Sequence, residues 1–389
     1  MKERSVGPLS GLRMVEMVGI GPAPLAAMLL SDLGAEVIRI DRPQPVDLGL
    51  ARPVRFDLAA RGRRSIAIDL KRPEGVECAL ALIEQADALI EGFRPGVMER
   101  LGLGPDVCLA RNPRLVYGRM TGWGQEGPLA HTAGHDINYI ALTGALEAIG
   151  RKGAPPTVPL NYLGDYAGGT MFLVLGLLAA ILRARECGQG QVVDAAMIDG
   201  VSALSTPLIG LRAAGLYNHP RGENVLDGGA PFYDVYECAD GKYVAVGAIE
   251  HKFRDLMLDK LGLREQMPDL DDRANWDEGR RLLSERFRQK TRDEWAALFD
   301  GSDACVTPVL TFEEAPDHPH HRARRRYVTL DGIVQPAPAP RFSGHAIAAE
   351  RLQPPEAPGA SSEAILRDWG VDAESTQRWL ASGVIVSHT

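Results

Sequence analysis

The chain has 389 residues, of which 45% are hydrophobic, and this length allows two domains with cores of their own. A formal net charge of −8 supplies no basic field, which argues against a nucleic-acid partner. Five cysteines without a C-x-x-C pair argue against a disulfide framework or a zinc site, and favour reduced, buried thiols.

The N-terminal stretch MKERSVGPLSGLRMVEMV has no apolar core followed by a cleavage site, so no signal peptide is expected. We therefore expect a cytoplasmic protein that does not associate with a membrane. A regular alternation of strand-like and helix-like segments follows. Strands are expected at residues 13–18, 35–41, 65–70, 88–92 and 114–120, with helices at 24–35 and 74–85. This order predicts an α/β fold with a parallel sheet covered by helices.

Residues 168–182, GGTMFLVLGLLAAIL, carry no charge and are shorter than the roughly 20 residues that cross a bilayer. We expect a buried core helix there. The large domain is predicted to cover residues 1–222.

A smaller α+β domain is predicted at residues 223–311. It opens with a hairpin that turns at Asp240-Gly241, because this dipeptide tolerates positive φ angles. Helices are expected at residues 251–261 and 277–289, and another after Thr291, where Thr291 and Glu294 fit a capping box. Residues 312–389 are predicted to be a linker and a C-terminal segment that returns to the large domain. Their proline-rich runs, 334–344 and 352–360, are expected to be extended.

VGIGPAP, after the first strand, resembles a dinucleotide fingerprint, but Pro24 replaces the third glycine, which disfavours a nicotinamide cofactor. An anion site at the start of the following helix is the simpler interpretation. Guanidinium groups bind phosphate oxygens in pairs, so the cations of the first hundred residues are candidate phosphate ligands, although each alone could be an ordinary surface charge. They are Arg39, Arg42, Arg52, Arg55, Arg61, Arg63, Arg64, Lys71, Arg94 and Arg100.

Three acidic or imidazole positions are candidates for catalysis. In AGHDINYIALTG, His135 and Asp136 precede a helix-like run, and Asp136 could simply cap the amides of Asn138 or Tyr139. Asp165 also begins a helix, but neighbouring glycines leave room for a ligand. Glu250 could be an ordinary first-turn acid.

A run of histidines, His318, His320 and His321, lies beside ARRR without a carboxylate or cysteine pattern around it. We expect no metal site there.

Taken together, several segments of the chain resemble the α-methylacyl-CoA racemases of the class III CoA-transferase superfamily, from about Pro8 to about Pro340. The segments are GLRMVEMVGIGPAPLAAMLLSDLGAEVIRIDRP, EGFRPGVMERLGLGP, RMTGWGQEGP, AGHDINYIALTGAL, PLNYLGDYAGGTMF, GQGQVVDAAMIDG, LDGGAPFYDVYECADGKYVAVGAIE and SDACVTPVLTFEEAP. The tail, ending in VIVSHT, differs from animal members in lacking a terminal peroxisomal signal, which again favours a cytoplasmic protein.

The resemblance implies a Rossmann-like large domain, a small domain and an interlocked homodimer that binds acyl-CoA as its substrate, without a separate cofactor. It implies that His135 and Asp165 are the catalytic pair and that Glu250 orients the histidine. The implied CoA contacts are Arg42, Ile68, Asp69, Leu70, Lys71, Arg94, Arg100, Gly134, Asp136, Ile137, Asn138 and Tyr139. His251-Lys252 stands where Pro-Gln is usual, so the geometry beside Glu250 is expected to differ.

Inversion of a carbon beside a thioester requires one group to remove a proton and another to return one on the opposite face. Histidine, with an ordinary pKa of about 6.5, suits both roles near neutral pH, whereas Asp165 needs burial to raise its pKa. Backbone N–H groups at the two helix starts could stabilise the enolate. A CoA-transferase that uses Asp165 as its nucleophile is the main alternative, followed by a non-catalytic acyl-CoA binder.

Overall fold

The computed structural model describes residues 7–44, 52–345 and 352–387. The expectations about a leader and a terminal targeting signal rest in part on residues 1–6 and 388–389, which lie outside these ranges. The chain forms two compact units. Unit 1 comprises Met1–Thr143, Leu160–Leu204 and His321–Thr389, and unit 2 comprises Gly144–Pro159 and Ser205–His320. The domains predicted at 1–222, 223–311 and 312–389 follow the chain continuously, whereas each unit combines separated segments.

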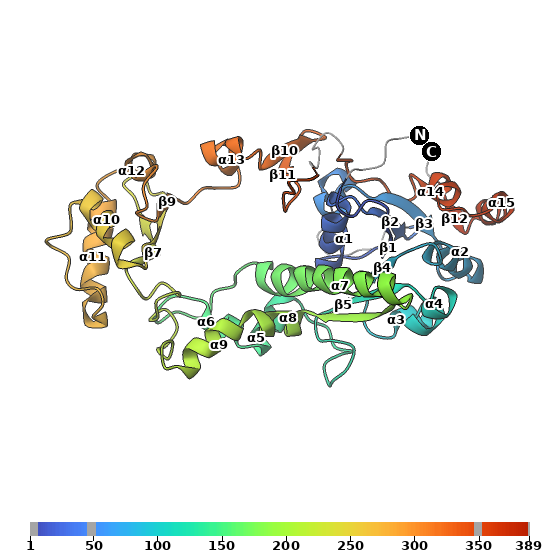
Figure 1. Cartoon of the computed structure of the whole chain (residues 1–389), viewed down its shortest axis with the longest axis horizontal. Helices are drawn as coiled ribbons and strands as arrows, with labels where there is room; N and C mark the ends of the chain where they lie inside the picture. Colours follow the sequence, from blue (N-terminus) through green and yellow to red (C-terminus); the bar gives the residue numbers. More distant parts are fainter. Residues whose placement is uncertain (1–6, 45–51, 346–351, 388–389) are drawn as a thin grey trace. The chain divides into compact units, whose positions relative to one another are not determined.

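Unit 1 is built on one seven-stranded sheet in the order β12-β3-β2-β1-β4-β5-β6 (Figure 1). The strands are β1 (Arg13–Met17), β2 (Glu36–Asp41), β3 (Arg64–Ile68), β4 (Ala88–Glu91), β5 (Val116–Thr121), β6 (Gln191–Ala196) and β12 (Ile385–Val386). Every pairing is parallel except that of β12 with β3. The predicted α/β fold with a parallel sheet is confirmed, and the end of the chain contributes an edge strand to it.

Helices cover both faces of this sheet, which explains why its central strands are apolar throughout. Alternate side chains point to opposite faces: Met17 and Ile40 belong to one core, and Met14 and Val37 to the other. The first core is closed by α2 (Pro73–Ile83), α4 (Pro105–Arg111), α14 (Ser362–Asp368) and α15 (Ala373–Ala381), and the second by α1 (Pro22–Asp32) and α7 (Met171–Cys187). Shorter helices α3 (Val97–Arg100), α5 (Asp136–Leu142) and α8 (Met197–Leu204) complete the unit.

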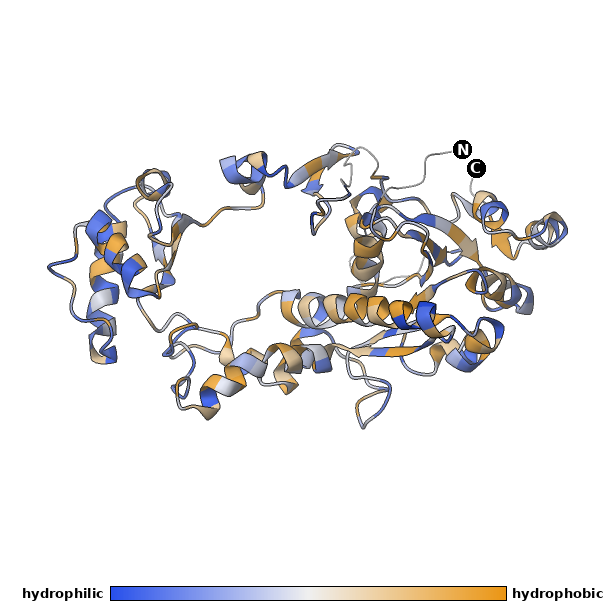
Figure 2. Cartoon of the chain, viewed as in Figure 1, coloured by the Kyte–Doolittle hydropathy of each residue, from blue (hydrophilic) through white to orange (hydrophobic). Residues whose placement is uncertain are grey.

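The helix predicted at residues 168–182 is longer than expected. A π-helix, η3 (Tyr162–Thr170), runs directly into α7, and together they form a helix of 26 residues that is long and apolar enough, by length and composition alone, to cross a membrane. Figure 2 shows the hydrophobic character of α7 along most of its length. Leu173 and Leu177 are buried against the sheet, but Leu175 and Leu182 on other faces are 63% and 71% exposed. The predicted core helix is therefore buried on the face toward the sheet but exposed on other faces.

Unit 2 contains a three-stranded antiparallel sheet, β7-β8-β9, and its own core. Its elements are α6 (Ala145–Ala148), α9 (Thr206–Ala213), β7 (Tyr233–Glu237), β8 (Tyr243–Gly247), α10 (His251–Leu261), α11 (Trp276–Phe287), α12 (Arg292–Phe299) and β9 (Val306–Pro308), and α13 (Pro319–Ala323) begins at its end. The hairpin turns where expected, with Gly241 at φ 71°. The capping box is also confirmed, because Glu294 accepts the N–H of Thr291 at 2.8 Å and Thr291 accepts that of Glu294 at 3.3 Å.

Two expectations need correction. The proline-rich run from residue 334 does not begin as an extended connector, because Ile333–Pro336 (β11) pairs with Tyr327–Leu330 (β10) in an antiparallel hairpin. Its Gln335 is buried, and its side chain accepts a hydrogen bond from Arg61 at 2.8 Å. All five cysteines are free, as expected, but Cys187 and Cys305 are exposed rather than buried.

Candidate active site

A cavity of about 290 Å³ opens in unit 1 at the carboxyl ends of the parallel strands. It is lined by the end of β5, by the segments that follow β1, β4 and β5, and by residues near the starts of α5, η3 and α8. The lining residues are Ile20, Gly21, Pro22, Gly92, Phe93, Arg94, Pro95, Met120, Thr121, Gly122, Trp123, Ala130, Thr132, Ala133, Gly134, His135, Tyr139, Asp165 and Met197. β1 and β4 are adjacent, yet their connections run in opposite directions along the sheet. Such a switch point is where ligands bind in open α/β sheets.

His135 stands at the start of α5, where it is the N-cap residue in extended conformation. Its side chain is exposed, and its backbone N–H donates to Asn138 Oδ1 at 3.0 Å. The preceding loop is held by Tyr139, whose hydroxyl donates to the carbonyl of Gly134. A Cβ at Gly122 would lie 2.0 Å from the Tyr139 ring, so only glycine allows this packing. The histidine is thus presented to the cavity on a well-supported loop.

Asp165 lies in the first turn of η3 and is half-buried. Its Oδ2 accepts a hydrogen bond from Asn161 Nδ2 at 3.1 Å. Burial raises the pKa of Asp165 and the neighbouring carboxylate of Asp136 raises it further, while the Asn161 bond and the charge of His135 lower it. This is the direction that a carboxyl group needs to act as an acid or base.

Asp136 does not cap its own helix, contrary to the simpler expectation. Its side chain is buried, and Oδ1 accepts the backbone N–H of Asp165 at 2.7 Å. A Cβ at Gly164 would lie 2.6 Å from that oxygen, so the approach of the two segments depends on glycine. Asp136 therefore links the segment of His135 to that of Asp165.

Tyr139, which lines the same cavity, is also buried, and its surroundings change the pKa of its hydroxyl. Burial and the charge of Asp165 raise the pKa of Tyr139 to about 12, and the charge of Arg94 opposes this shift. Arg94 and Asp165 therefore both lie within electrostatic range of one ring.

The ten cations singled out in the first hundred residues fall into two groups. Six are ion-paired and serve the fold, often in the core, as in Arg63 with Glu16 at 2.6 Å and Arg61 with Asp32 at 2.5 Å. The paired cations are Arg39, Arg52, Arg55, Arg61, Arg63 and Arg64. Within the described ranges the other four, Arg42, Lys71, Arg94 and Arg100, are exposed and make no ion pair. These four are the cations that the family resemblance assigns to CoA.

Three of the unpaired cations share one edge of the sheet. Arg42 directly follows β2, Lys71 lies three residues after β3, and Arg94 lies three residues after β4. The carboxyl ends of parallel strands meet at the same edge, which is also the edge of the cavity. An anion such as a CoA phosphate would meet uncompensated charge there.

The remaining predicted contacts are placed less uniformly. Gly134 and Tyr139 line the cavity, and Ile137 and Asn138 are exposed on α5. Ile68, the last residue of β3, is buried in the core, so only its backbone is available to a ligand. Asp69 and Leu70 follow it, and Asp69 Oδ1 accepts the N–H of Lys71 at 3.1 Å.

Glu250 belongs to unit 2 and is not among the residues that line this cavity. It is the exposed N-cap of α10 rather than a first-turn acid, and its carbonyl accepts the N–H of Phe253. The adjacent His251 lies 3.5 Å from Asp271 and 3.0 Å from Arg254. His251, which stands where proline is usual in the family, thus contacts Asp271 and Arg254 within unit 2.

His318, His320 and His321 lie at or near α13, at the end of unit 2. Within the parts of the chain that are described, no three potential metal ligands come together.

Sequence reasoning missed Asn161 and Glu91. Asn161 is four residues before Asp165, a spacing that brings side chains together on a helix and could have drawn attention to it. Glu91 is a buried carboxylate at the end of β4. Its ion-pair partner, Arg119, comes from another strand, so no local pattern pointed to it.

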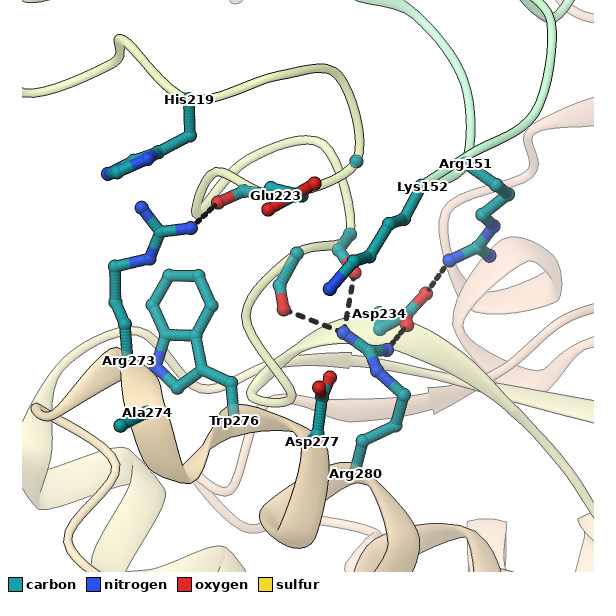
Figure 3. Close-up of a pocket in the computed structure, with 13 residues that line it drawn as sticks. Arg151, Lys152, His219, Glu223, Asp234, Arg273, Ala274, Trp276, Asp277 and Arg280 are labelled. Atoms are coloured by element: carbon teal, nitrogen blue, oxygen red, sulfur yellow. Dashed lines mark hydrogen bonds and ion pairs between the residues drawn. The ribbon is translucent and has the colours of Figure 1, made fainter.

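A larger cavity of about 590 Å³ lies in unit 2 and contains none of the predicted residues (Figure 3). Its cations are largely neutralised or held by carbonyls. Asp234 pairs with both Arg151 and Arg280, and Arg280 also donates to the carbonyls of Gly228 and Gly229. The smaller cavity in unit 1 is the better candidate, because His135 and Asp165 line it together with Arg94.

Comparison with known proteins identifies the family. Residues 9–359 match the model of CoA-transferase family III. A Mus musculus protein named alpha-methylacyl-CoA racemase is 45% identical over 369 residues, 94% of each chain, and the Homo sapiens protein of that name is 42% identical over 385 residues, 98% of each. A crystal structure of a CAIB/BAIF family protein from Brucella suis covers 94% of this chain and 100% of its own, with a TM-score of 0.79 and 25% identity.

Proposed function

The chain belongs to CoA-transferase family III, and from this premise we propose that it is an isomerase that inverts 2-methyl-branched acyl-CoA thioesters by 1,1-proton transfer. One observation carries the proposal: His135 and Asp165, from two different helix starts, line the same cavity. The racemase relatives at 45% and 42% identity support the same activity.

The reaction needs two groups that can exchange a proton with one carbon. His135, as base, removes the α-proton from one face of the thioester, and Asp165, whose raised pKa makes it a better proton donor and acceptor near neutral pH than an ordinary aspartate, delivers a proton to the other face. In the opposite direction the two exchange roles. The two groups act on one site, since the charge of His135 lowers the pKa of Asp165.

The enolate oxygen between the two transfers requires hydrogen-bond donors. The N–H of Asp165 is occupied by Asp136, so the first turn of α5, directly after His135, is the better source of backbone donors. The thioester carbonyl itself acidifies the α-carbon, so the proposed chemistry needs no cofactor beyond the CoA portion of the substrate.

CoA recognition is assigned to the four unpaired cations, Arg42, Lys71, Arg94 and Arg100. Glu250 is proposed to orient His135, as the family resemblance implies, although the two belong to different units. A homodimer and a cytoplasmic location are part of the same proposal. Sedimentation of the purified protein and fractionation of the native cell test these two points.

The decisive experiment is incubation of a single enantiomer of a 2-methylacyl-CoA with the protein in heavy water. Chiral chromatography and mass spectrometry should show deuterium at the α-carbon as the configuration scrambles. An absence of exchange would defeat the proposal.

Transfer of CoA to another acid would favour the CoA-transferase alternative, in which Asp165 attacks the thioester carbonyl, releases CoA and forms a mixed anhydride. In that case CoA would pass to an added carboxylic acid, and hydroxylamine would trap a modified Asp165. Tight CoA binding with neither reaction would instead indicate a non-catalytic binder.

A further inference from the structure

Glu91 is a buried carboxylate three residues before Arg94, which lines the cavity. It is the last residue of β4, and its side chain is 1% exposed. One carboxylate oxygen, Oε2, accepts the backbone N–H of Phe93 at 2.7 Å. Phe93 lies in the turn that lines the cavity and immediately precedes Arg94. The carboxylate therefore shapes the turn on which this cation stands.

The other carboxylate oxygen leads, through Arg119 and Glu99, to α3, the helix that also carries Arg100. Glu91 Oε1 accepts a hydrogen bond from Arg119 Nε at 2.9 Å, and the two residues face each other in the register of β4 and β5. The remaining Arg119 nitrogens donate to both oxygens of Glu99 at 2.8 and 3.3 Å. Glu99 lies in α3, next to Arg100. A continuous set of bonds thus joins β4, β5 and α3, the segments adjacent in sequence to Arg94 and Arg100.

We infer that Glu91 and Arg119 are positioning residues for CoA recognition, and that protonation of Glu91 loosens Arg94 and Arg100 and weakens CoA binding. Neither residue needs to contact the substrate. The inference rests on the proposed function, because it assigns Arg94 and Arg100 to CoA, and it adds a pH-dependent control of affinity at that site.

The surroundings of Glu91 support protonation near neutral pH. Burial raises the pKa of Glu91 to about 7, against the opposing effects of the Phe93 hydrogen bond and of Arg119, with a small further rise from Glu99. The titratable side chains nearest to it are Arg119 and Tyr117 on β5 and Glu99 on α3.

Asp194 on β6 stands beside Arg119 in the strand register and lies within range of its charge. Protonation of Glu91 turns one carboxylate oxygen into an O–H donor. That oxygen can then no longer accept a hydrogen bond from Arg119 or from the N–H of Phe93. The bonds weaken as pH falls through about 7.

The test measures the Kd of CoA itself by calorimetry, from about pH 5.5 to about pH 8.5, so that no turnover is needed. Three proteins are compared: the wild type, Glu91→Gln and the control Glu77→Gln. The control removes an exposed acid whose partner, Arg111, lies 2.8 Å away on the surface. At the alkaline end, Glu91→Gln should bind CoA about tenfold more weakly than the wild type, and the control should match the wild type.

At the acid end, the wild type should approach Glu91→Gln. Ionisation of the CoA phosphates affects all three proteins alike, so the difference between the curves isolates Glu91. With a racemisation substrate, the KM of Glu91→Gln should rise more than its kcat falls. Identical pH curves for the wild type and Glu91→Gln would overturn the inference.

Two further variants separate this outcome from failure of the proposed function. Arg94→Ala and Arg100→Ala should each weaken CoA binding directly. If they do and Glu91→Gln does not, only the positioning role fails; if none of the three does, the assigned CoA site fails with it. Arg119→Lys keeps the charge but loses the forked bonds, so it should weaken CoA binding even if Glu91→Gln folds poorly.

Discussion

The carboxylate of Asp136 accepts the backbone N–H of Asp165 at 2.7 Å. The bond connects the residue that follows His135 to the other member of the proposed catalytic pair, 29 positions further along the chain. Asp136 Oδ2 is buried and has no hydrogen-bond partner among the described residues. The side chain thus makes a single directed contact, and that contact helps to set the separation of the two proton-transfer groups.

Replacement of Asp136 should damage both stability and catalysis. Asp136→Ala leaves the N–H of Asp165 unpaired, so the free energy of unfolding should fall by about 1.5–3 kcal/mol, as measured by urea denaturation. The loss of alignment should lower kcat about 10- to 100-fold. Glu186→Ala, which removes an exposed acid, is the control. An Asp136→Ala protein with wild-type kcat would show that the bond has no catalytic role.

The two proton-transfer groups should be individually indispensable. His135→Ala and Asp165→Asn should each reduce racemisation by roughly 10²- to 10⁴-fold, the usual contribution of a general acid or base. The measurement is configuration change and deuterium uptake of the same 2-methylacyl-CoA. His131→Ala, an exposed histidine in the same loop, should retain activity. Near-normal activity in either of the first two variants would contradict the assignment.

The same Asp165→Asn variant should be more stable than the wild type at neutral pH. The raised pKa of Asp165 means that the folded protein holds the proton more tightly than the unfolded chain. The ionised carboxylate therefore destabilises the fold above its folded-state pKa. The difference in stability between Asp165→Asn and the wild type should become smaller as pH falls toward 3.8, the ordinary pKa of aspartate, because Asp165 is then protonated in both the folded and the unfolded wild type. Melting temperatures measured across this range for both proteins provide the test, and a constant difference would argue against it.

The unpaired cations should control affinity rather than chemistry. Arg94→Ala should raise KM for acyl-CoA about tenfold and leave kcat nearly unchanged, since the phosphates are bound equally in the ground and transition states. Added salt should weaken the wild type more than the variant. Arg111→Ala, at an exposed cation already paired with Glu77, is the matched control. A fall in kcat without a change in KM would show that Arg94 acts on the reaction itself.

Sequence patterns alone predicted much of the fold. The strands 13–18 and 35–41, the hairpin at Asp240-Gly241 and the capping box at Thr291 are all present, and the helix predicted at 24–35 is present as Pro22–Asp32, beginning two residues earlier than predicted. Each depends on neighbours within a few residues, because backbone conformation, caps and side-chain periodicity are local properties. The resemblance to a known family, rather than any local pattern, indicated the pairing of His135 with Asp165.

Only the tertiary structure decided which charged groups are available. Arg63 and Arg94 are the same residue type in the same cation-rich stretch, yet Arg63 is buried against Glu16 and Arg94 lines the cavity. Asp136 binds a backbone amide from another helix, and Glu91 acquires its pKa from burial between strands. Such outcomes depend on desolvation and on partners distant in sequence, and these are defined only when the sheet has assembled.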